Sequence, residues 1–324
     1  MENKINISAL LQQNYGIHAN EIIPLTDKVF KIITASKIYA LKVSEKNDDF
    51  IMKQLFAYKA MSANVLPIYR TVLNEYEVVA DGQRFYLTDY VLGIRVPLEK
   101  QIHYYVELLQ KMHEKTRLVV DVSDEEISKI YQKEYKKLQN SYKILQKNMD
   151  NYELKDDRSP YEWYFMMVYP MIYSVLQRAH QELKQFYDEL KSRHQMPISL
   201  VHGNVNIANV LVSENNTYLI NFERSVFSLS VLDMYYFLEN YHQVPGINSI
   251  IMDYIKKEED PLLRHYFFFK SLLIDVEELE ESLDQHSLTK IAVLNERVAP
   301  HMLAMQIYDT INKPTTATQA APQE

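Results

Sequence analysis

Apolar and polar positions divide the chain into a short part with mixed patterns and a long helical part. In the first 92 residues, runs typical of strands alternate with helical spacing. The helical spacing predicts helices over 5–15 and 48–61. The other runs predict a strand–turn–strand over 21–33 and strands over 39–43, 65–69, 76–80 and 84–90. Beyond residue 92 the spacing is mostly helical and predicts helices over 97–115, 123–151, 159–193, 231–241, 247–257, 262–279 and 288–311. Pro170 should kink or break the third of these helices. The order of elements predicts an α+β protein with a small antiparallel sheet and a helical remainder.

Residues 200–223 interrupt the helical pattern. Two apolar runs, Val210–Val212 and Tyr218–Ile220, flank a polar turn and predict a β-hairpin. Polar residues stand at both ends of this hairpin, at His202–Asn209 and at Asn221–Glu223. The hairpin therefore brings two polar groups to one place, where they could meet a single ligand.

Composition excludes several classes of protein. The net charge of -8 and the pI of about 5.7 argue against nucleic-acid binding, and the absence of Cys excludes disulfides and thiolate metal sites. No apolar run reaches the roughly 18–20 residues of a membrane-spanning helix, and the first residues show no signal-peptide pattern. We expect a soluble protein without membrane insertion that stays in the compartment where it is made. Residues 313–324, rich in Thr, Ala, Pro and Gln, are predicted to form a disordered tail.

The hairpin segment resembles the catalytic segment of the aminoglycoside and choline phosphotransferase branch of the protein-kinase-like fold. That branch carries H-G-D-x-x-x-x-N, a hairpin and then D-F-[DE]; here the frame reads His202-Gly203-Asn204, four residues, Asn209, and later Asn221-Phe222-Glu223. The resemblance implies two lobes: a sheet-containing N-terminal lobe over 1–92 and a helical C-terminal lobe over 93–312, with the hairpin 200–223 in the second lobe.

Both acidic positions of that frame hold amides. Asn204 stands where the family has its catalytic base, and Asn221 where it has the Asp that binds the metal. An Asn amide has no useful basicity, and a positioned general base contributes roughly 10²–10⁴ in rate. Mg²⁺ is usually held by one or two carboxylates together with substrate phosphates, so two neutral amides are poor ligands. We therefore expect no active catalytic residue and no metal site.

Other family positions are partly kept. Lys42 lies in a strand-like Ala-Leu-Lys-Val and matches the family's nucleotide-binding Lys, although it could also be a solvated lysine of an edge strand. Lys42 and Asn209 would then be the remnant of a nucleotide site. The loop between Glu21 and Tyr39 contains no Gly to admit phosphates, and Gln54 occupies the position expected for the acidic partner of Lys42. By the same resemblance, His202 and Asp233 should have structural roles.

Two functions remain open. Among kinase-like proteins with degraded motifs, the chain resembles the CotS-like spore-coat proteins, in particular the YutH type. This resemblance implies a non-catalytic pseudokinase: a structural or interaction protein of the bacterial endospore coat, made in the mother-cell cytoplasm, with other coat proteins as partners and no cofactor. The alternative is a small-molecule phosphotransferase acting on a choline-, aminoglycoside- or sugar-like substrate, using ATP and Mg²⁺, with Glu223 as a substitute metal ligand.

Overall fold

The computed structural model describes residues 6–44, 50–276 and 286–312, which form two compact units. One unit comprises residues up to 118 together with 199–228, and the other comprises 119–198 and the chain from 229 onward. The lobe boundary after residue 92 and the tail over 313–324 stay predictions: the boundary refers to kinase lobes rather than packing units, and the tail lies outside the described residues.

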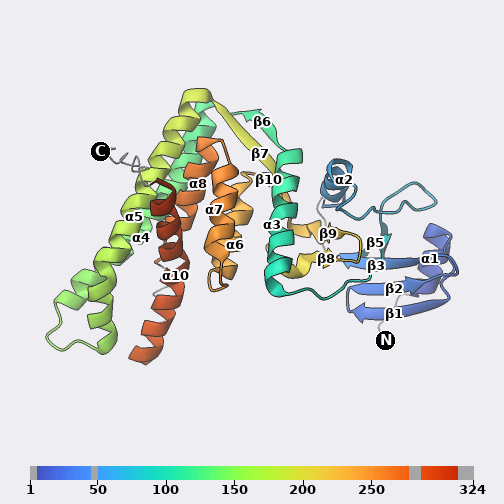
Figure 1. Cartoon of the computed structure of the whole chain (residues 1–324), viewed down its shortest axis with the longest axis horizontal. Helices are drawn as coiled ribbons and strands as arrows, with labels where there is room; N and C mark the ends of the chain where they lie inside the picture. The colour runs from blue at the N-terminus through green and yellow to red at the C-terminus, as the bar shows by residue number, and fades with distance from the viewer. Residues whose placement is uncertain (1–5, 45–49, 277–285, 313–324) are drawn as a thin grey trace, which may run out of the picture. The chain divides into compact units, whose positions relative to one another are not determined.

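The first unit contains an antiparallel sheet of five strands; the sequence predicts a small antiparallel sheet here, with one strand more. The strand order is β1-β2-β3-β5-β4, with bounds β1 Glu21–Thr26, β2 Val29–Ile33, β3 Ile38–Ser44, β4 Val78–Ala80 and β5 Gln83–Asp89 (Figure 1). The strand predicted over 65–69 is wrong, because only isolated bridges form there, from Val65 to Leu219 and from Ile68 to Thr88. Pro67 lies between them and has no N–H to donate, so a continuous ladder cannot form.

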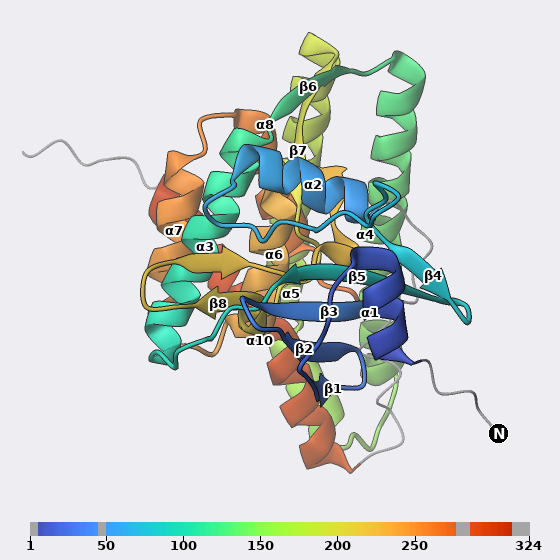
Figure 2. The same cartoon turned by 90° about the vertical axis from the view of Figure 1, so that its right-hand side faces the viewer.

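The alternation of side chains along β3 gives the sheet two different faces. Leu41 and Val43 pack with Leu10 and Leu11 of α1 (Ile7–Tyr15), which ends at Gly16 as predicted. Lys42 points to the opposite face, since adjacent strand residues alternate. On that face Lys42 is paired in register with Tyr86, which packs against Phe50 at the start of α2 (Phe50–Ala60). Figure 2 shows the ribbon of α2 above the strands of this sheet.

The remainder of the first unit holds the predicted hairpin. Its elements are α3 Leu98–Lys115, the end of β7 (Gln195–Val201), the short 3-10 helix η1 Ile207–Asn209, β8 Val210–Val212, β9 Thr217–Leu219, η2 Phe222–Arg224 and β10 Val226–Ser228. Strands β8 and β9 pair antiparallel, and β10 pairs with β7 over 199–201. The Leu219 amide also donates to the carbonyl of Asn64, so the hairpin is tied to the segment that follows α2. The hairpin prediction is confirmed.

The second unit is helical. Its elements are β6 Leu118–Asp121, which pairs with β7, and α4 Asp124–Glu153, α5 Pro160–Arg193, α6 Val231–Tyr241, α7 Ile247–Lys257, α8 Pro261–Leu272 and α10 Ser287–Asn312. Helices α4 and α5 run side by side as a long hairpin, with α8 packed along α5 (Figure 1). Capping boxes start both long helices: Ser123 with Glu126, and Ser159 with Glu162.

Two helix predictions in this unit need correction. Helix α5 continues through Pro170, which is exposed, so the lost backbone hydrogen bond falls on the solvent side while Phe165 and Ile172 stay buried. The helix predicted over 262–279 ends at Leu272, and 277–279 lie outside the described residues. Ile274 and Val276 are buried in a non-helical segment, so an apolar pattern continued past the true helix end.

No helix in the described part of the chain combines the length and the apolar character needed to cross a lipid bilayer.

Candidate functional site

A chain of hydrogen bonds joins four of the residues singled out in the sequence. Lys42 Nζ donates to Asn221 Oδ1 at 3.2 Å, and Asn221 Nδ2 donates to Asn209 Oδ1 at 2.7 Å. Asn209 Nδ2 then donates to the backbone carbonyl of Asn204 at 2.8 Å. Residues from β3, from η1 and from the end of the hairpin therefore meet in one continuous polar path within the first unit.

The two ends of this path determine how every amide is oriented. An ammonium group can only donate, and a backbone carbonyl can only accept. Asn221 must therefore turn its oxygen to Lys42 and its nitrogen to Asn209, and Asn209 must turn its nitrogen to the carbonyl of Asn204. Neither amide can be reversed without placing like groups against each other. Both amides are thus required by the hydrogen bonding that surrounds them.

A carboxylate at position 221 would not fit this path. An ionised carboxylate has two acceptor oxygens and no donor. One oxygen could accept from Lys42, but the other would face Asn209 Oδ1, and turning Asn209 over would set its oxygen against the carbonyl of Asn204. The path is complete as it stands, and it is complete only with amides.

The carbonyl of Asn204 is the point where the loop is held together. Tyr105 of α3 places its hydroxyl 3.3 Å from this oxygen, and His202 Nδ1 lies 3.1 Å away. His202 Nε2 lies 2.8 Å from the carbonyl of Ile220, so the buried ring lies between the two ends of the hairpin. The side chain of Asn204 itself makes no hydrogen bond with the described residues. Position 204 thus contributes its backbone to the site, not a basic side chain.

Lys42 is an electrostatically unmatched cation. Burial lowers the pKa of its ammonium from 10.5 to about 8, with the nearby Glu223 carboxylate opposing the shift. Lys42 forms no ion pair with a described carboxylate; Asn221 is its hydrogen-bond partner, and the ring centre of Tyr86 lies 6.0 Å from Nζ. Burial, with a contribution from Glu223, also raises the pKa of the Tyr86 hydroxyl. The surroundings hold a lysine while providing little compensation for its charge.

Gln54 does not support Lys42. It is buried in α2 as expected for the position, but its amide donates to the carbonyl of Leu66 at 3.2 Å. This contact fastens α2 to the segment after it. Gln54 therefore has a structural role within the first unit.

The side chains of Asn221 and Asn209 do not fit Mg²⁺. That ion takes hard oxygen ligands, usually including one or two carboxylates, at close range. The oxygens of Asn221 and Asn209 already accept from Lys42 and Asn221. Within the described residues, no group of three or more His, Asp or Glu side chains could hold a metal ion.

Gly203 is a structural requirement that the sequence reasoning did not identify. Its φ is +69°, and a Cβ there would lie 2.4 Å from the carbonyl oxygen of Arg224. Asn221 also has a left-handed backbone, with φ of 66°. These backbone conformations let the segment before β8 and the segment after β9 approach each other closely. The signal in the sequence was the glycine itself, one of only five in the chain.

Two further predicted residues are not members of this hydrogen-bonded path. Glu223 lies in η2, two residues after Asn221, and is half-buried; its carboxylate acts on Lys42 through its charge. Asp233 is fully buried in the first turn of α6, in the second unit, and its proposed link to the loop stays a prediction.

A cavity of about 570 Å³ lies beside the end of β5 but does not include the hydrogen-bonded path. Its lining comes from the start of β3, the segment after α2, the end of β5 with the two residues after it, and the hairpin turn, with Lys37 and Asp89 forming an ion pair at 2.5 Å. Lys42, Asn209 and Asn221 are not among its lining residues. The hollow therefore gives no support to a nucleotide site around Lys42.

Comparison with known proteins shows the fold but no sequence family. No family model matches the chain, and no curated protein matches its sequence. An aminoglycoside phosphotransferase from Alicyclobacillus acidocaldarius matches its structure with a TM-score of 0.57 and 15% identity, over 95% of this chain and 98% of that one. Spectinomycin phosphotransferase in complex with ADP and spectinomycin matches with a TM-score of 0.52 and 13% identity, over 93% of this chain and 97% of that one. The chain therefore has the aminoglycoside phosphotransferase-like, protein-kinase-like fold.

Proposed function

We propose that this chain is a pseudokinase, a non-catalytic structural or interaction protein that uses the kinase-like fold as a docking body. The observation that carries this proposal is the closed hydrogen-bonded path from Lys42 through Asn221 and Asn209 to the carbonyl of Asn204. In an active phosphotransferase the corresponding groups would hold metal and phosphate. Here they hold one another.

Three further features support the absence of catalysis. The side chain at the base position is a neutral amide, and the turn between β1 and β2, at Asp27-Lys28, contains no glycine to admit phosphates. Gln54 is engaged with Leu66 and leaves Lys42 without an acidic partner. Each change removes a different part of the transition-state stabilisation that phosphoryl transfer needs.

The spore coat is the location we propose, with other coat proteins as partners. This part rests on the resemblance of the degraded motifs to the CotS-like proteins. It can be tested by expressing the chain as a fluorescent fusion in sporulating cells of an endospore-forming bacterium. A signal that moves from the mother-cell cytoplasm to the surface of the forespore and is recovered in the coat fraction supports the proposal. A signal that stays diffuse in the mother cell overturns it.

Catalysis is tested separately by ATP turnover. Wild type and Lys42→Met are compared with Mg·ATP and choline, aminoglycoside or sugar acceptors, by measuring ADP release. We expect equal, background release from both proteins. Release by wild type that Lys42→Met abolishes would show an active phosphotransferase and overturn the non-catalytic proposal.

One observation favours the alternative of a rearranged phosphotransferase. Glu223 lies close enough to Lys42 to oppose the lowering of its pKa, so one carboxylate is present near the lysine. In this alternative Glu223 would hold Mg²⁺ and ATP would be the cofactor. Glu223→Gln should then abolish any turnover that Lys42→Met also abolishes, whereas an effect of only one variant would argue against a shared site.

A further inference from the structure

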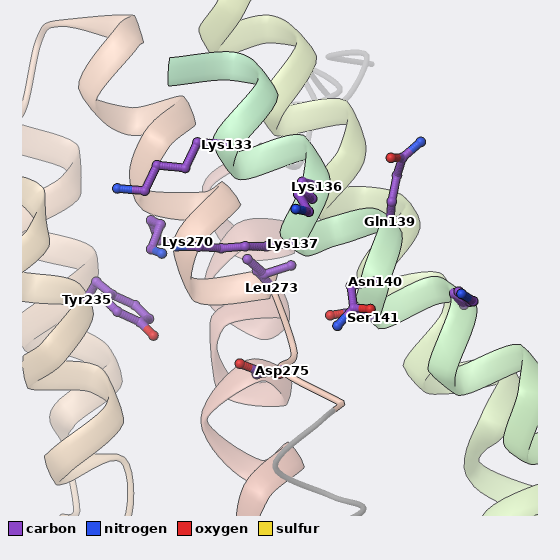
Figure 3. Close-up of a pocket in the computed structure, with 11 residues that line it drawn as sticks. Lys133, Lys136, Lys137, Gln139, Asn140, Ser141, Tyr235, Lys270, Leu273 and Asp275 are labelled. Atoms are coloured by element: carbon purple, nitrogen blue, oxygen red, sulfur yellow. The ribbon is translucent and has the colours of Figure 1, made fainter. Parts of the chain in front are cut away.

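A lysine-lined pocket lies within the second unit, and nothing in the kinase-like motifs accounts for it. The cavity measures about 700 Å³ and lies among α4, α6, α8 and the segment after α8 (Figure 3). Its charged lining consists of five lysines and one aspartate: Lys133, Lys136, Lys137, Lys143, Lys270 and Asp275. Lys137 extends from α4 toward Lys270 on α8 (Figure 3).

Most of these ammonium groups have no counter-charge. Lys133, Lys136 and Lys143 make no ion pair or hydrogen bond with the described residues. Lys137 and Lys270 share a single carboxylate, Glu134, whose Oε2 lies 3.5 Å and 3.8 Å from their Nζ atoms. These distances are too long for hydrogen bonds, and Glu134 Oε2 is a buried atom without a hydrogen-bond partner. Positive charge in the pocket therefore exceeds the negative charge available to balance it.

Lys270 is the most confined of the five. Its side chain is only 15% exposed, and its ammonium lies 5.4 Å from the ring centre of Tyr235. Burial, and the charges of Lys137 and Lys133, lower its pKa, while Glu134 and Glu239 oppose this. A bound anion would supply the missing negative charge at the point where the pocket is least solvated.

The spacing on α4 makes the cluster unfavourable in the free protein. Lys133 and Lys137 are four residues apart and Lys133 and Lys136 three apart, so like charges lie on neighbouring turns of one helix. Such pairs destabilise a helix, and a local feature that opposes folding is most often found at a functional site. A ligand that neutralises the lysines would remove the repulsion.

We propose that this pocket binds a small molecule carrying two or more phosphate groups. Lysine suits phosphate as a compact, strongly hydrated point charge, and its lowest-energy partner is a dense anion. Five lysines on two helices exceed what one phosphate needs, so a ligand with two or more phosphate groups matches the pocket better. The volume falls within the roughly 300–1,000 Å³ of small-molecule sites.

The first test measures binding of defined anions by calorimetry at low ionic strength. Pyrophosphate and tripolyphosphate serve as probes, with inorganic phosphate and sulfate at matched ionic strength as comparisons. We expect saturable one-to-one binding that is at least ten times tighter for tripolyphosphate than for phosphate, and that weakens with added salt. Equal weak binding of all four anions would show only non-specific attraction of anions to the lysines, and would overturn the proposal. Absence of binding up to about 10 mM probe would overturn it as well.

A matched pair of variants assigns the binding to the pocket. Lys133→Gln/Lys137→Gln removes two lining charges, and Lys147→Gln/Lys184→Gln removes two exposed charges that do not line the pocket. The first variant should weaken tripolyphosphate binding at least tenfold, and the second should leave it within twofold of wild type. Equal losses in both variants would show a general charge effect and contradict the assignment. Tripolyphosphate binding should also survive Lys42→Met, so the outcome is independent of whether the first unit binds nucleotide.

One further comparison separates small molecules from surfaces. Binding of the same proteins is measured to two further probes: vesicles rich in anionic lipid and, separately, long-chain polyphosphate. Binding to either that depends on Lys133 and Lys137, without binding of tripolyphosphate, would replace the proposed ligand with a polyanionic surface.

Discussion

The two polar clusters of this chain differ in whether their donors and charges are matched. In the first unit, Lys42, Asn221 and Asn209 pass hydrogen bonds in one direction and end on a carbonyl, with no amide group left over. In the second unit, a pocket with five lysines contains three that bond to no described residue. One cluster has satisfied its own hydrogen bonds, and the other gathers like charges that a bound anion would neutralise.

The difference indicates where a ligand would gain binding energy. A ligand entering the first cluster must break hydrogen bonds that are already made, so it gains little from replacing them. A polyanion entering the second cluster creates interactions where none exist and relieves repulsion. This difference favours the lysine pocket over the Lys42 cluster as a place for a ligand, which is what the two proposals above require.

The largest effect on stability should come from disturbing the backbone conformation at Gly203, next to the hydrogen-bonded path. Gly203→Ala places a side chain at φ of +69° and against the carbonyl of Arg224, and should lower the free energy of unfolding by about 2–5 kcal/mol. Gly82→Ala is the control, because Gly82 has φ of +75° with nothing within 4 Å of the added Cβ. It should lose only about 1–2 kcal/mol from backbone strain. Equal losses in urea denaturation would mean that Gly203 is not tightly packed.

The buried charge of Lys42 should appear as a dependence of stability on pH. Its pKa is about 8 in the folded chain and 10.5 ordinarily, so the unfolded state binds more protons between these values and stability rises with pH there. The cost is fully present below pH 8 and absent above pH 10.5. Relative to Lys42→Met, wild type should gain on the order of 2 kcal/mol across this window, allowing for partial exposure. Parallel stability curves for the two proteins would contradict the burial of an unmatched ammonium.

A carboxylate at position 221 should weaken the pH dependence of stability that Lys42 causes. Asn221→Asp sets a negative charge beside Lys42, which should raise the pKa of the lysine and flatten the rise by about 1 kcal/mol or more. Asn204→Asp is the matched control: it makes the same chemical change in a side chain that bonds to no described residue, and should keep the wild-type slope. Urea denaturation across pH 7–10 reports both. Identical slopes in the two variants would show that position 221 has no special relation to Lys42.

The smallest effect on stability concerns the lysine pocket in the absence of ligand. Lys133→Gln/Lys136→Gln removes a like-charged pair from α4, neither member of which forms an ion pair with a described residue, and should raise the free energy of unfolding by about 0.5 kcal/mol at low salt. Lys147→Gln/Lys184→Gln should change it less. The gain should shrink in 0.5 M salt, because screening weakens the repulsion that the substitution removes. A loss of stability in the first variant would show that these lysines already have partners.

The fold was more predictable than the pairing of its polar groups. The order of strands and helices and the hairpin spacing of 200–223 follow from local periodicity, and most elements were predicted within a few residues. Two errors arose where one residue decided the outcome: Pro67 prevented a strand, and exposed Pro170 did not break a helix. A third arose where apolar residues continue beyond the end of α8 at Leu272. Local propensity sets these elements, but the side that faces solvent decides whether a proline is tolerated.

The hydrogen-bonded path shows what sequence cannot supply. The motif frame singled out Lys42, Asn209 and Asn221, but not that the amides would bond to one another, nor that Asn204 would act through its backbone. Such contacts join residues up to 179 positions apart and depend on tertiary geometry. The lysine pocket was missed for a related reason: the spacing of 123–151 predicts a helix but not its neighbours, and Lys270 joins the lysines of that helix only in the folded chain.

The central claim, that the nucleotide region is closed by its own amides, is tested most directly by calorimetric titration of Mg·ATP. The measurement uses Lys133→Gln/Lys137→Gln, so that binding of the triphosphate in the lysine pocket does not contribute. We predict no saturable binding tighter than about 1 mM, equivalent to roughly -4 kcal/mol. Tighter one-to-one binding that requires Mg²⁺ and disappears when Lys42→Met is added would contradict the account.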